Sequence, residues 1–203
     1  MLRRLAAALM RLAWRLGAYE SPWERVPMRV PATAFGTGSR GHFAQYFEGE
    51  SSVRVQSVDD IVEWLRGCEY VTDADLFHER DRWQHPAAFE QLRRGDCEDF
   101  ALWTWRKLAE IGIDAEFVVG RVLGSQVDGQ HAWVVYRVNR EDFLFEPAAQ
   151  SRQRMIRTLA EAKDEYVPHF AVNPRFATTA FVGCIVDSYR DKERLRAATM
   201  SAR

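Results

Sequence analysis

Residues 95–102 of the chain read Gly95-Asp96-Cys97-Glu98-Asp99-Phe100-Ala101-Leu102. This stretch is typical of the beginning of an α-helix that carries a thiol in its first turn. Asp96 suits the N-cap position, and Asp99 follows it at the spacing of a capping box. Gly112 is placed to end the helix in a left-handed turn, so we expect a helix over residues 97–111. Backbone N–H groups at a helix N-terminus stabilise a thiolate, which makes Cys97 a candidate nucleophile.

The predicted helix has apolar residues on more than one side. Phe100, Leu102 and Trp103 lie outside its main apolar stripe, so we expect the helix to be enclosed over most of its surface. A second interpretation of Cys97 stays open, in which it is a small core residue beside a helix cap. The residues that form the main stripe at helical spacing are Cys97, Ala101, Thr104, Trp105, Leu108 and Ile111.

The composition limits the class of protein. With 203 residues, of which 47% are hydrophobic, the chain suits one globular domain with a sizeable core. The formal net charge of -1 gives no reason to expect a nucleic acid as partner. The three cysteines, Cys68, Cys97 and Cys184, are widely spaced and odd in number, which is typical of a reducing compartment and not of a disulfide framework.

The sequence contains no uninterrupted apolar stretch long enough to span a membrane. Near the N-terminus, Arg11 and Arg15 interrupt the apolar stretch that a signal peptide would need. We therefore expect the protein to be cytoplasmic, and a processed signal peptide is the alternative.

From residue 57 onward the pattern predicts short helices followed by strands. Ser57 and Asp60 form the N-terminal cap of a helix that ends near Gly67. A helix over residues 86–93 begins with proline at its first position. Helices followed by antiparallel strands make an α+β fold. The remaining expected elements are strands over residues 115–123, 131–138 and 143–146, a helix over 154–165, a last strand over 181–186 and a solvated helical tail from 187 onward.

Thiol catalysis needs a nucleophile, a base that accepts its proton and a group that orients the base. His131 begins the second predicted strand, and Glu146 ends the third. If residues 138–141 form a four-residue hairpin loop, His131 and Glu146 are diagonal neighbours on one sheet face, about 7–8 Å apart. A three-residue loop would place them on opposite faces. With the four-residue register, Cys97, His131 and Glu146 are the candidate catalytic residues.

In these roles Cys97 attacks an acyl carbon as a thiolate. His131 takes the thiol proton and later protonates a leaving amine, while Glu146 orients His131. The backbone N–H of Cys97 is a candidate donor to the oxyanion. The side chain of Gln91 is a second candidate donor, although Gln91 suits a surface position on its helix equally well.

Several segments, in this order, resemble the bacterial transglutaminase-like cysteine peptidases over roughly residues 57–150. They are Asp81-Arg82-Trp83-Gln84-His85-Pro86, residues 95–101, His131-Ala132-Trp133-Val134-Val135-Tyr136 and Phe145-Glu146-Pro147. The resemblance implies a papain-like α+β core, in which a helix cluster with the nucleophile at a helix N-terminus packs on an antiparallel sheet. It also implies a Cys-His-Asp triad that acts on an amide bond. Glu146 stands where the family usually has aspartate, and the longer glutamate can still orient a histidine.

The chain divides into three expected parts. Residues 1–50 hold a basic amphipathic helix and a linker rich in proline and glycine, residues 51–190 a transglutaminase-like catalytic domain, and residues 191–203 a charged C-terminal tail. The N-terminal helix suits docking on its own domain, or contact with a partner or a membrane surface. The leucines that recur along it are Leu2, Leu5, Leu9, Leu12 and Leu16.

Three carboxylates, those of Asp96, Glu98 and Asp99, surround the candidate nucleophile, and like charge disfavours a thiolate. They either turn away into caps and arginine pairs or bind calcium through their oxygens, as the resemblance implies for some members of the family. The predicted chemistry itself requires no cofactor. A zinc site made of Cys97, His131 and Glu146 is disfavoured, because no paired cysteine or histidine spacing accompanies them.

We expect a cysteine-dependent hydrolase that cleaves an amide bond in a protein or peptide through a thioester acyl-enzyme. Two alternatives remain open. An acyl transferase would use the same acyl-enzyme with an amine in place of water, and an inactive peptide-binding module would use the same cleft without thiol chemistry.

Overall fold

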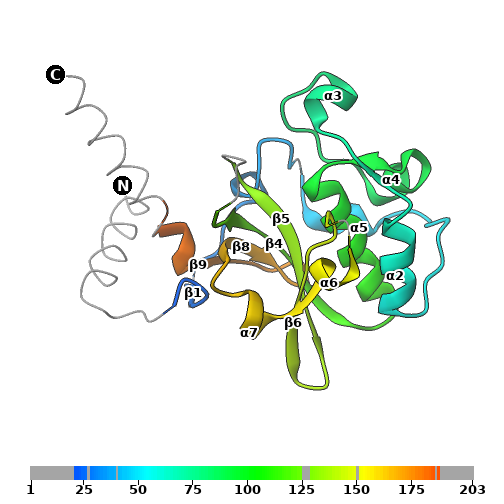
Figure 1. The fold of residues 1–203 in the computed structure, drawn as a ribbon. Helices are drawn as coiled ribbons and strands as arrows, with labels where there is room; N and C mark the ends of the chain where they lie inside the picture. The colour runs from blue at the N-terminus through cyan, green and yellow to red at the C-terminus, as the bar shows by residue number, and fades with distance from the viewer. Residues whose placement is uncertain are drawn as a thin grey trace.

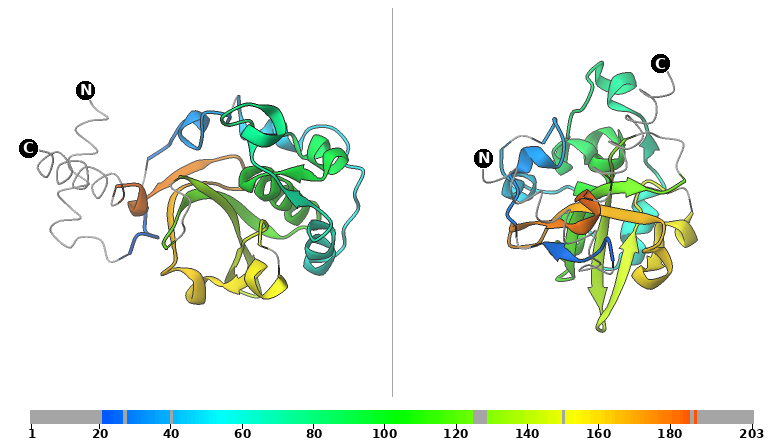
Figure 2. Two further views of the ribbon diagram at one scale, coloured as in Figure 1. Left: turned by 45° about the horizontal axis from the view of Figure 1, so that its top comes forward. Right: turned by 90° about the vertical axis from the view of Figure 1, so that its left-hand side faces the viewer.

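A seven-stranded antiparallel sheet forms the centre of the computed structural model, with most helices packed against one face and the short helix of residues 159–162 against the other (Figure 1). The strand order is β1-β9-β8-β4-β5-β6-β7, and the sheet is strongly curled (Figure 2). The structure describes residues 21–26, 28–39, 41–124, 129–149, 151–185 and 187. Helices packed on an antiparallel sheet confirm the expected α+β fold.

The predicted strands over residues 115–123, 131–138 and 143–146 are confirmed. From β4 to β7 the sheet is an antiparallel meander, and β8 then pairs with the other edge of β4. The strands of the sheet are β1 (Arg25–Val26), β4 (Asp114–Val122), β5 (His131–Val138), β6 (Glu141–Phe145), β7 (Ile156–Thr158), β8 (Tyr166–Val172) and β9 (Thr178–Phe181), and a separate parallel pair consists of β2 (Glu69–Tyr70) and β3 (Arg94–Gly95).

The helices before the sheet follow the sequence signals. Asp60 N donates to Ser57 Oγ and Ser57 N donates to Asp60 Oδ2, each over 3.1 Å, so the predicted capping box of α2 is confirmed. The helices are α2 (Val58–Leu65), α3 (Asp73–Phe77), α4 (Pro86–Leu92), α5 (Cys97–Glu110), α6 (Arg152–Met155) and α7 (Leu159–Ala162), with two short 3-10 helices, η1 (Ala32–Ala34) and η2 (Phe43–Phe47).

Helix α5 covers nearly the predicted range, and Gly112 after it has a φ of 77°. The predicted capping box is wrong. Asp96 occupies the N-cap position without a side-chain cap, and Asp99 accepts hydrogen bonds from the backbone N–H (2.7 Å) and side-chain amide of Gln84. The reason is burial. Asp99 is fully enclosed, and its carboxylate is satisfied by the segment packed against it.

The hairpin between β5 and β6 has the predicted register. Its turn is the pair Asn139 and Arg140, both with positive φ, so Val138 faces Glu141 and Arg137 faces Asp142. A two-residue turn gives the same pairing of Arg137 with Asp142 as the predicted four-residue loop. His131 and Glu146 therefore lie on one face of the sheet.

The prediction of one helix over residues 154–165 is wrong. Residues 156–158 form β7, which pairs with residues 143–145 of β6 and divides the segment into α6 and α7. Backbone groups along the edge of β6 need partners, and this need outweighs the helical periodicity. Thr158 then begins α7 with a capping box made with Glu161.

The strand predicted over residues 181–186 lies earlier, because β9 ends at Phe181 and residues 182–185 are helical. Strand β8 was not predicted, and it contains Pro168, a residue that is uncommon inside strands. Pro168 faces Gly120 where the β4–β8 register shifts, and a bulge tolerates proline. Within the expected tail, Asp187 is helical and buried.

Residues 1–20 and 188–203, which include the expected N-terminal helix and the whole charged tail of residues 191–203, lie outside the described residues. The described residues between 22 and 50 form only short elements, yet Phe35, Phe43 and Tyr46 belong to the main core between helices and sheet. In the part of the chain that the structure describes, no helix has the length and apolarity needed to cross a membrane.

Gly120 on β4 faces His131 on β5 and allows a close approach of β8. A Cβ atom there would come within 2.1 Å of the Val167 carbonyl oxygen and 2.7 Å of the Trp133 ring. We predict that Gly120→Ala lowers the free energy of unfolding by about 1–3 kcal/mol, measured by urea denaturation. Gly129→Ala is the control, because a Cβ at Gly129 meets nothing within 4 Å. Equal stability of the two variants would contradict the prediction.

Candidate active site

Cys97 is the first residue of α5, and its thiol is half-buried beside the beginning of β5. The thiol donates a hydrogen bond to Glu98 Oε2 over 3.2 Å. The backbone N–H of Ala132 lies within hydrogen-bonding reach of the sulfur. Ala132 follows His131 directly, so the helix start and the histidine strand meet at the thiol.

One pocket brings the three predicted residues together. Its volume is about 450 Å³, and Cys97, His131 and Glu146 all line it. The other lining residues are Tyr70, Val122, Gly129, Gln130, Ala148, Ala149 and Tyr166. An open pocket at a thiol and an imidazole gives a substrate access to both groups.

His131 and Glu146 are in direct contact. His131 Nε2 lies 2.7 Å from Glu146 Oε2, as the predicted register requires. Tyr166 donates its hydroxyl hydrogen to the same carboxylate oxygen over 3.1 Å. Because Nε2 is used by Glu146, Nδ1 is the ring nitrogen of His131 left for proton exchange with Cys97. In the described part of the chain, no hydrogen bond joins His131 to Cys97 in this resting arrangement.

The charge of Glu146 favours the imidazolium form of His131. Burial of the ring lowers the pKa of His131, but the charge of Glu146 and its hydrogen bond raise it, and the net shift is upward from 6.5. Glu146 is itself only 8% exposed, which strengthens its interaction with the ring.

The surroundings of Cys97 oppose its ionisation. Burial, followed by the charges of Glu98 and Asp96, raises the pKa of the Cys97 thiol well above 9.0, and the Ala132 N–H lowers it by less. The protonated thiol is therefore the resting form, and its activation requires His131 as a base or a change in the charge of the neighbouring carboxylates.

The carboxylates around Cys97 belong to a larger cluster than the sequence predicts. Oxygen atoms of Asp73, Asp96 and Asp99 lie within 4.8 Å of one another, and so do those of Asp73, Asp81 and Glu98. We call these five residues the acidic cluster. Asp73 and Asp81 were not predicted, because they belong to a polar segment before α4 that is distant from Cys97 in the sequence. Its high content of acidic residues was the available signal.

Burial dominates the electrostatics of the acidic cluster. It raises the pKa of Asp73 to about 6 and that of Asp99 to about 8, with further increases from neighbouring negative charges. Burial and the charge of Asp96 raise the pKa of Glu98 well above 4.5. Asp73 Oδ1 and Asp96 Oδ1 are buried and have no hydrogen-bond partner among the described residues. Within the same residues, no basic side chain forms an ion pair with the acidic cluster.

Gln91 does not lie at the site, so the interpretation of its side chain as an oxyanion donor is wrong. It is exposed on α4 and lines a different pocket, together with Phe77 and Leu92. Helix α4 ends at Arg93 in a left-handed conformation, and the chain turns into β3 before it reaches Cys97. The first N–H groups of α5 remain as candidate donors, because they have no partner within the helix.

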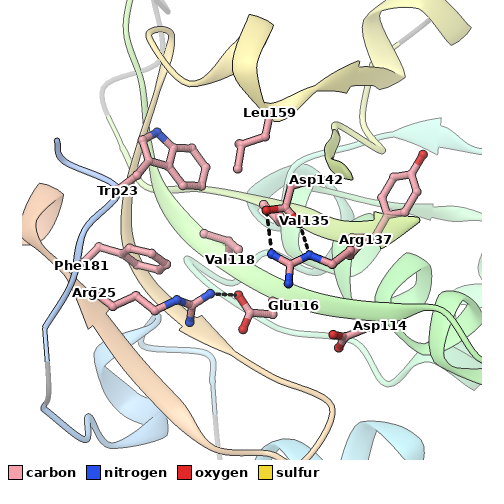
Figure 3. A pocket seen from close by; sticks show the side chains of 11 residues that line it. Trp23, Arg25, Asp114, Glu116, Val118, Val135, Arg137, Asp142, Leu159 and Phe181 are labelled. Atoms are coloured by element: carbon pink, nitrogen blue, oxygen red, sulfur yellow. Dashed lines mark hydrogen bonds and ion pairs between the residues drawn. The ribbon is translucent and has the colours of Figure 1, made fainter. Parts of the chain in front are cut away.

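A second pocket, of about 270 Å³, lies on the sheet face that points away from α5 (Figure 3). It is lined by several apolar side chains and by two ion pairs, Arg25–Glu116 and Arg137–Asp142. None of the described residues that line it is cysteine or histidine. The apolar side chains are Trp23, Val118, Val135, Leu159 and Phe181.

A helix-borne thiol beside a histidine strand in an α+β core defines the papain-like, transglutaminase-like class of cysteine peptidases. Residues 40–171 match the family described as bacterial transglutaminase-like cysteine proteinase (BTLCP). The chain belongs to this family. A comparison with curated protein sequences gives no match.

Solved structures give weaker similarities. Legionella pneumophila LapG matches with 20% identity and a TM-score of 0.45, over 57% of this chain and 63% of that chain. Its calcium-bound form matches with 18% identity and a TM-score of 0.47, over 65% and 72%. A putative cysteine protease from Cytophaga hutchinsonii matches with 12% identity and a TM-score of 0.40, over 68% and 55%. Similarities this low are not evidence about the activity of this chain.

Replacement of Glu146 tests the electrostatic coupling in the site. Glu146→Gln removes the negative charge that raises the pKa of His131, while burial continues to lower it. We predict that the pKa of His131 falls below its value in wild type, measured by NMR titration of labelled histidine in the full-length protein. The His131 signal is assigned by its loss in His131→Ala. A pKa in the Gln variant equal to that of wild type would contradict the assigned role of Glu146.

Proposed function

We propose that this chain cleaves an amide bond in a protein or peptide substrate, with Cys97 as nucleophile, His131 as base and Glu146 as the group that orients His131. The observation that carries the proposal is the 2.7 Å contact of His131 Nε2 with Glu146 Oε2, in the pocket that Cys97 also lines. The approach of the Ala132 N–H to the sulfur supports it further.

The proposed reaction begins with transfer of the Cys97 proton to His131 Nδ1. The thiolate attacks the carbonyl carbon of the scissile amide, and N–H groups at the start of α5 stabilise the oxyanion. His131 gives the proton to the leaving amine, which departs as the thioester forms. Water, deprotonated by His131, then hydrolyses the thioester and releases the carboxylic acid. Glu146 stabilises the imidazolium at each stage where His131 holds the extra proton.

We also propose that the acidic cluster binds calcium, a cation that prefers several oxygen ligands. The residues fit this ion, because Asp73 is only 3% exposed, and its Oδ1 and that of Asp96 are buried without partners. Asp73, Asp96 and Asp99 would hold the ion, with Asp81 and Glu98 beside them. A bound calcium ion would supply positive charge that offsets the carboxylates next to Cys97.

The catalytic proposal is tested with iodoacetamide, which alkylates Cys97. We predict that His131→Ala slows this alkylation at neutral pH, because the thiol then lacks its base. The rate is followed from pH 4 to 10 by mass spectrometry of the peptide that contains Cys97, which separates it from Cys68 and Cys184. His78→Ala is the control, because His78 is exposed at the end of α3. Equal rates in wild type and His131→Ala would count against the proposal.

Cleavage is measured with a peptide library incubated with the full-length protein, and new termini are identified by mass spectrometry. We predict that they form with wild type and are lost with Cys97→Ala, and that His131→Ala reduces their rate of formation by about 10²–10⁴-fold. Amide adducts that replace the new termini when a primary amine is added would identify an acyl transferase. Peptide binding without thiol reactivity would identify a binding module.

The calcium proposal predicts that calcium raises the melting temperature of the full-length protein and that a chelator reverses the effect. Asp73→Asn should abolish this calcium-dependent shift. The substitution removes a buried carboxylate that lies close both to Asp96 and Asp99 and to Asp81 and Glu98. Asp164→Asn is the control on the exposed surface and should keep the shift. A melting temperature that calcium leaves unchanged in wild type would remove the calcium site.

A further inference from the structure

Tyr166 connects two strands that are not neighbours in the sheet. It is the first residue of β8, and its hydroxyl donates to Glu146 Oε2 over 3.1 Å, directly after the end of β6. In the strand order, β4 and β5 lie between β8 and β6. The curl of the sheet brings these ends toward each other (Figure 2). The oxygen that Tyr166 contacts is the one that contacts His131.

Among the described residues, one further group contacts the Glu146 carboxylate. Ala148 N donates to Oε1 over 3.4 Å, which is longer than the usual range of about 2.7–3.2 Å. The glutamate side chain also has one more rotatable bond than an aspartate. Within the described part of the chain, the hydroxyl of Tyr166 is therefore the shortest hydrogen-bonding contact of the carboxylate other than that with His131.

Tyr166 is well suited to hold a partner in place. It is 5% exposed, and the Trp133 ring packs edge-on against it with centroids 5.1 Å apart. The guanidinium carbon of Arg157 lies 5.6 Å from the centre of its ring. Burial, and then the charge of Glu146, raise the pKa of Tyr166 above 10, so the phenol keeps its proton and remains a donor.

We propose that Tyr166 is a positioning residue, whose hydroxyl holds the Glu146 carboxylate against His131 and thereby keeps the imidazole oriented for Cys97. This inference rests on the catalytic function proposed above. Tyr166 acts through Glu146, and its hydroxyl hydrogen is already engaged in that contact. The acid of the proposed triad is a glutamate, whose side chain is longer than that of aspartate and has one more rotatable bond. A contact that fixes the carboxylate therefore matters more here than it would for an aspartate.

The first test is the pKa of His131 in full-length Tyr166→Phe, measured by histidine NMR titration. If the hydroxyl holds Glu146, its removal lets the carboxylate leave the ring, and the pKa of His131 falls. If Glu146 holds its own position, loss of a donor leaves the charge of its carboxylate less stabilised by hydrogen bonds and its attraction to the imidazolium no weaker, so the pKa of His131 stays or rises. That outcome would overturn the proposal. Tyr136→Phe, a buried tyrosine on the opposite face of β5, should leave the pKa unchanged.

The second test is a double-mutant cycle on the alkylation of Cys97 by iodoacetamide. Tyr166→Phe should slow alkylation about tenfold, the effect of one hydrogen bond to a charged group, and should cause no further loss in a Glu146→Ala background. A tenfold loss in that background as well would show a structural role independent of Glu146 and overturn the proposal. If Cys97 is alkylated as fast in His131→Ala as in wild type, the proposed catalytic function fails. The pKa of His131 in Tyr166→Phe then decides the role of Tyr166 by itself.

Discussion

Burial of α5 on almost every side is the constraint on which the site depends. Eleven of its 14 residues are buried, including four with ionisable side chains, and a buried polar or charged group needs partners. Lys107 pairs with Glu90 at 3.1 Å, and Arg106 donates to the carbonyl oxygens of residues 46, 48 and 49. Asp99 is satisfied by Gln84. These contacts wrap the segments before α5 around it and hold its first residue, Cys97, against β5.

The same burial creates the electrostatic conflict at the nucleophile. A thiol at a helix N-terminus is normally favoured as a thiolate, but burial, followed by the charges of Glu98 and Asp96, raises the pKa of Cys97. Glu146 instead promotes loss of the Cys97 proton. It does so through His131, because it favours the imidazolium that must form when the thiol gives up its proton. The charge balance among carboxylates on the two sides of the thiol therefore controls the chemistry proposed for the pocket.

The sheet contributes by its curl as well as by its register. Alternation along β5 places His131 and Trp133 on the face opposite to the residues that pack under α5. Gly120 allows β8 and the Trp133 ring to approach closely, and Trp133 in turn packs against both His131 and Tyr166. The imidazole of His131 and the phenol of Tyr166 are thus both packed against the Trp133 ring.

Local signals in the sequence determined α5, its glycine end, the capped helix α2 and the register of the β5–β6 hairpin, because each depends on residues within a few positions of one another. The register was enough to place Glu146 beside His131. Only the tertiary structure decided that Asp99 binds Gln84, that Asp73 and Asp81 join the acidic cluster, and that Tyr166 contacts Glu146. It also overrode the helical pattern of residues 154–165 to complete the edge of β6. These outcomes follow from burial, which obliges each enclosed polar group to find a partner wherever packing brings one near, at any distance along the chain.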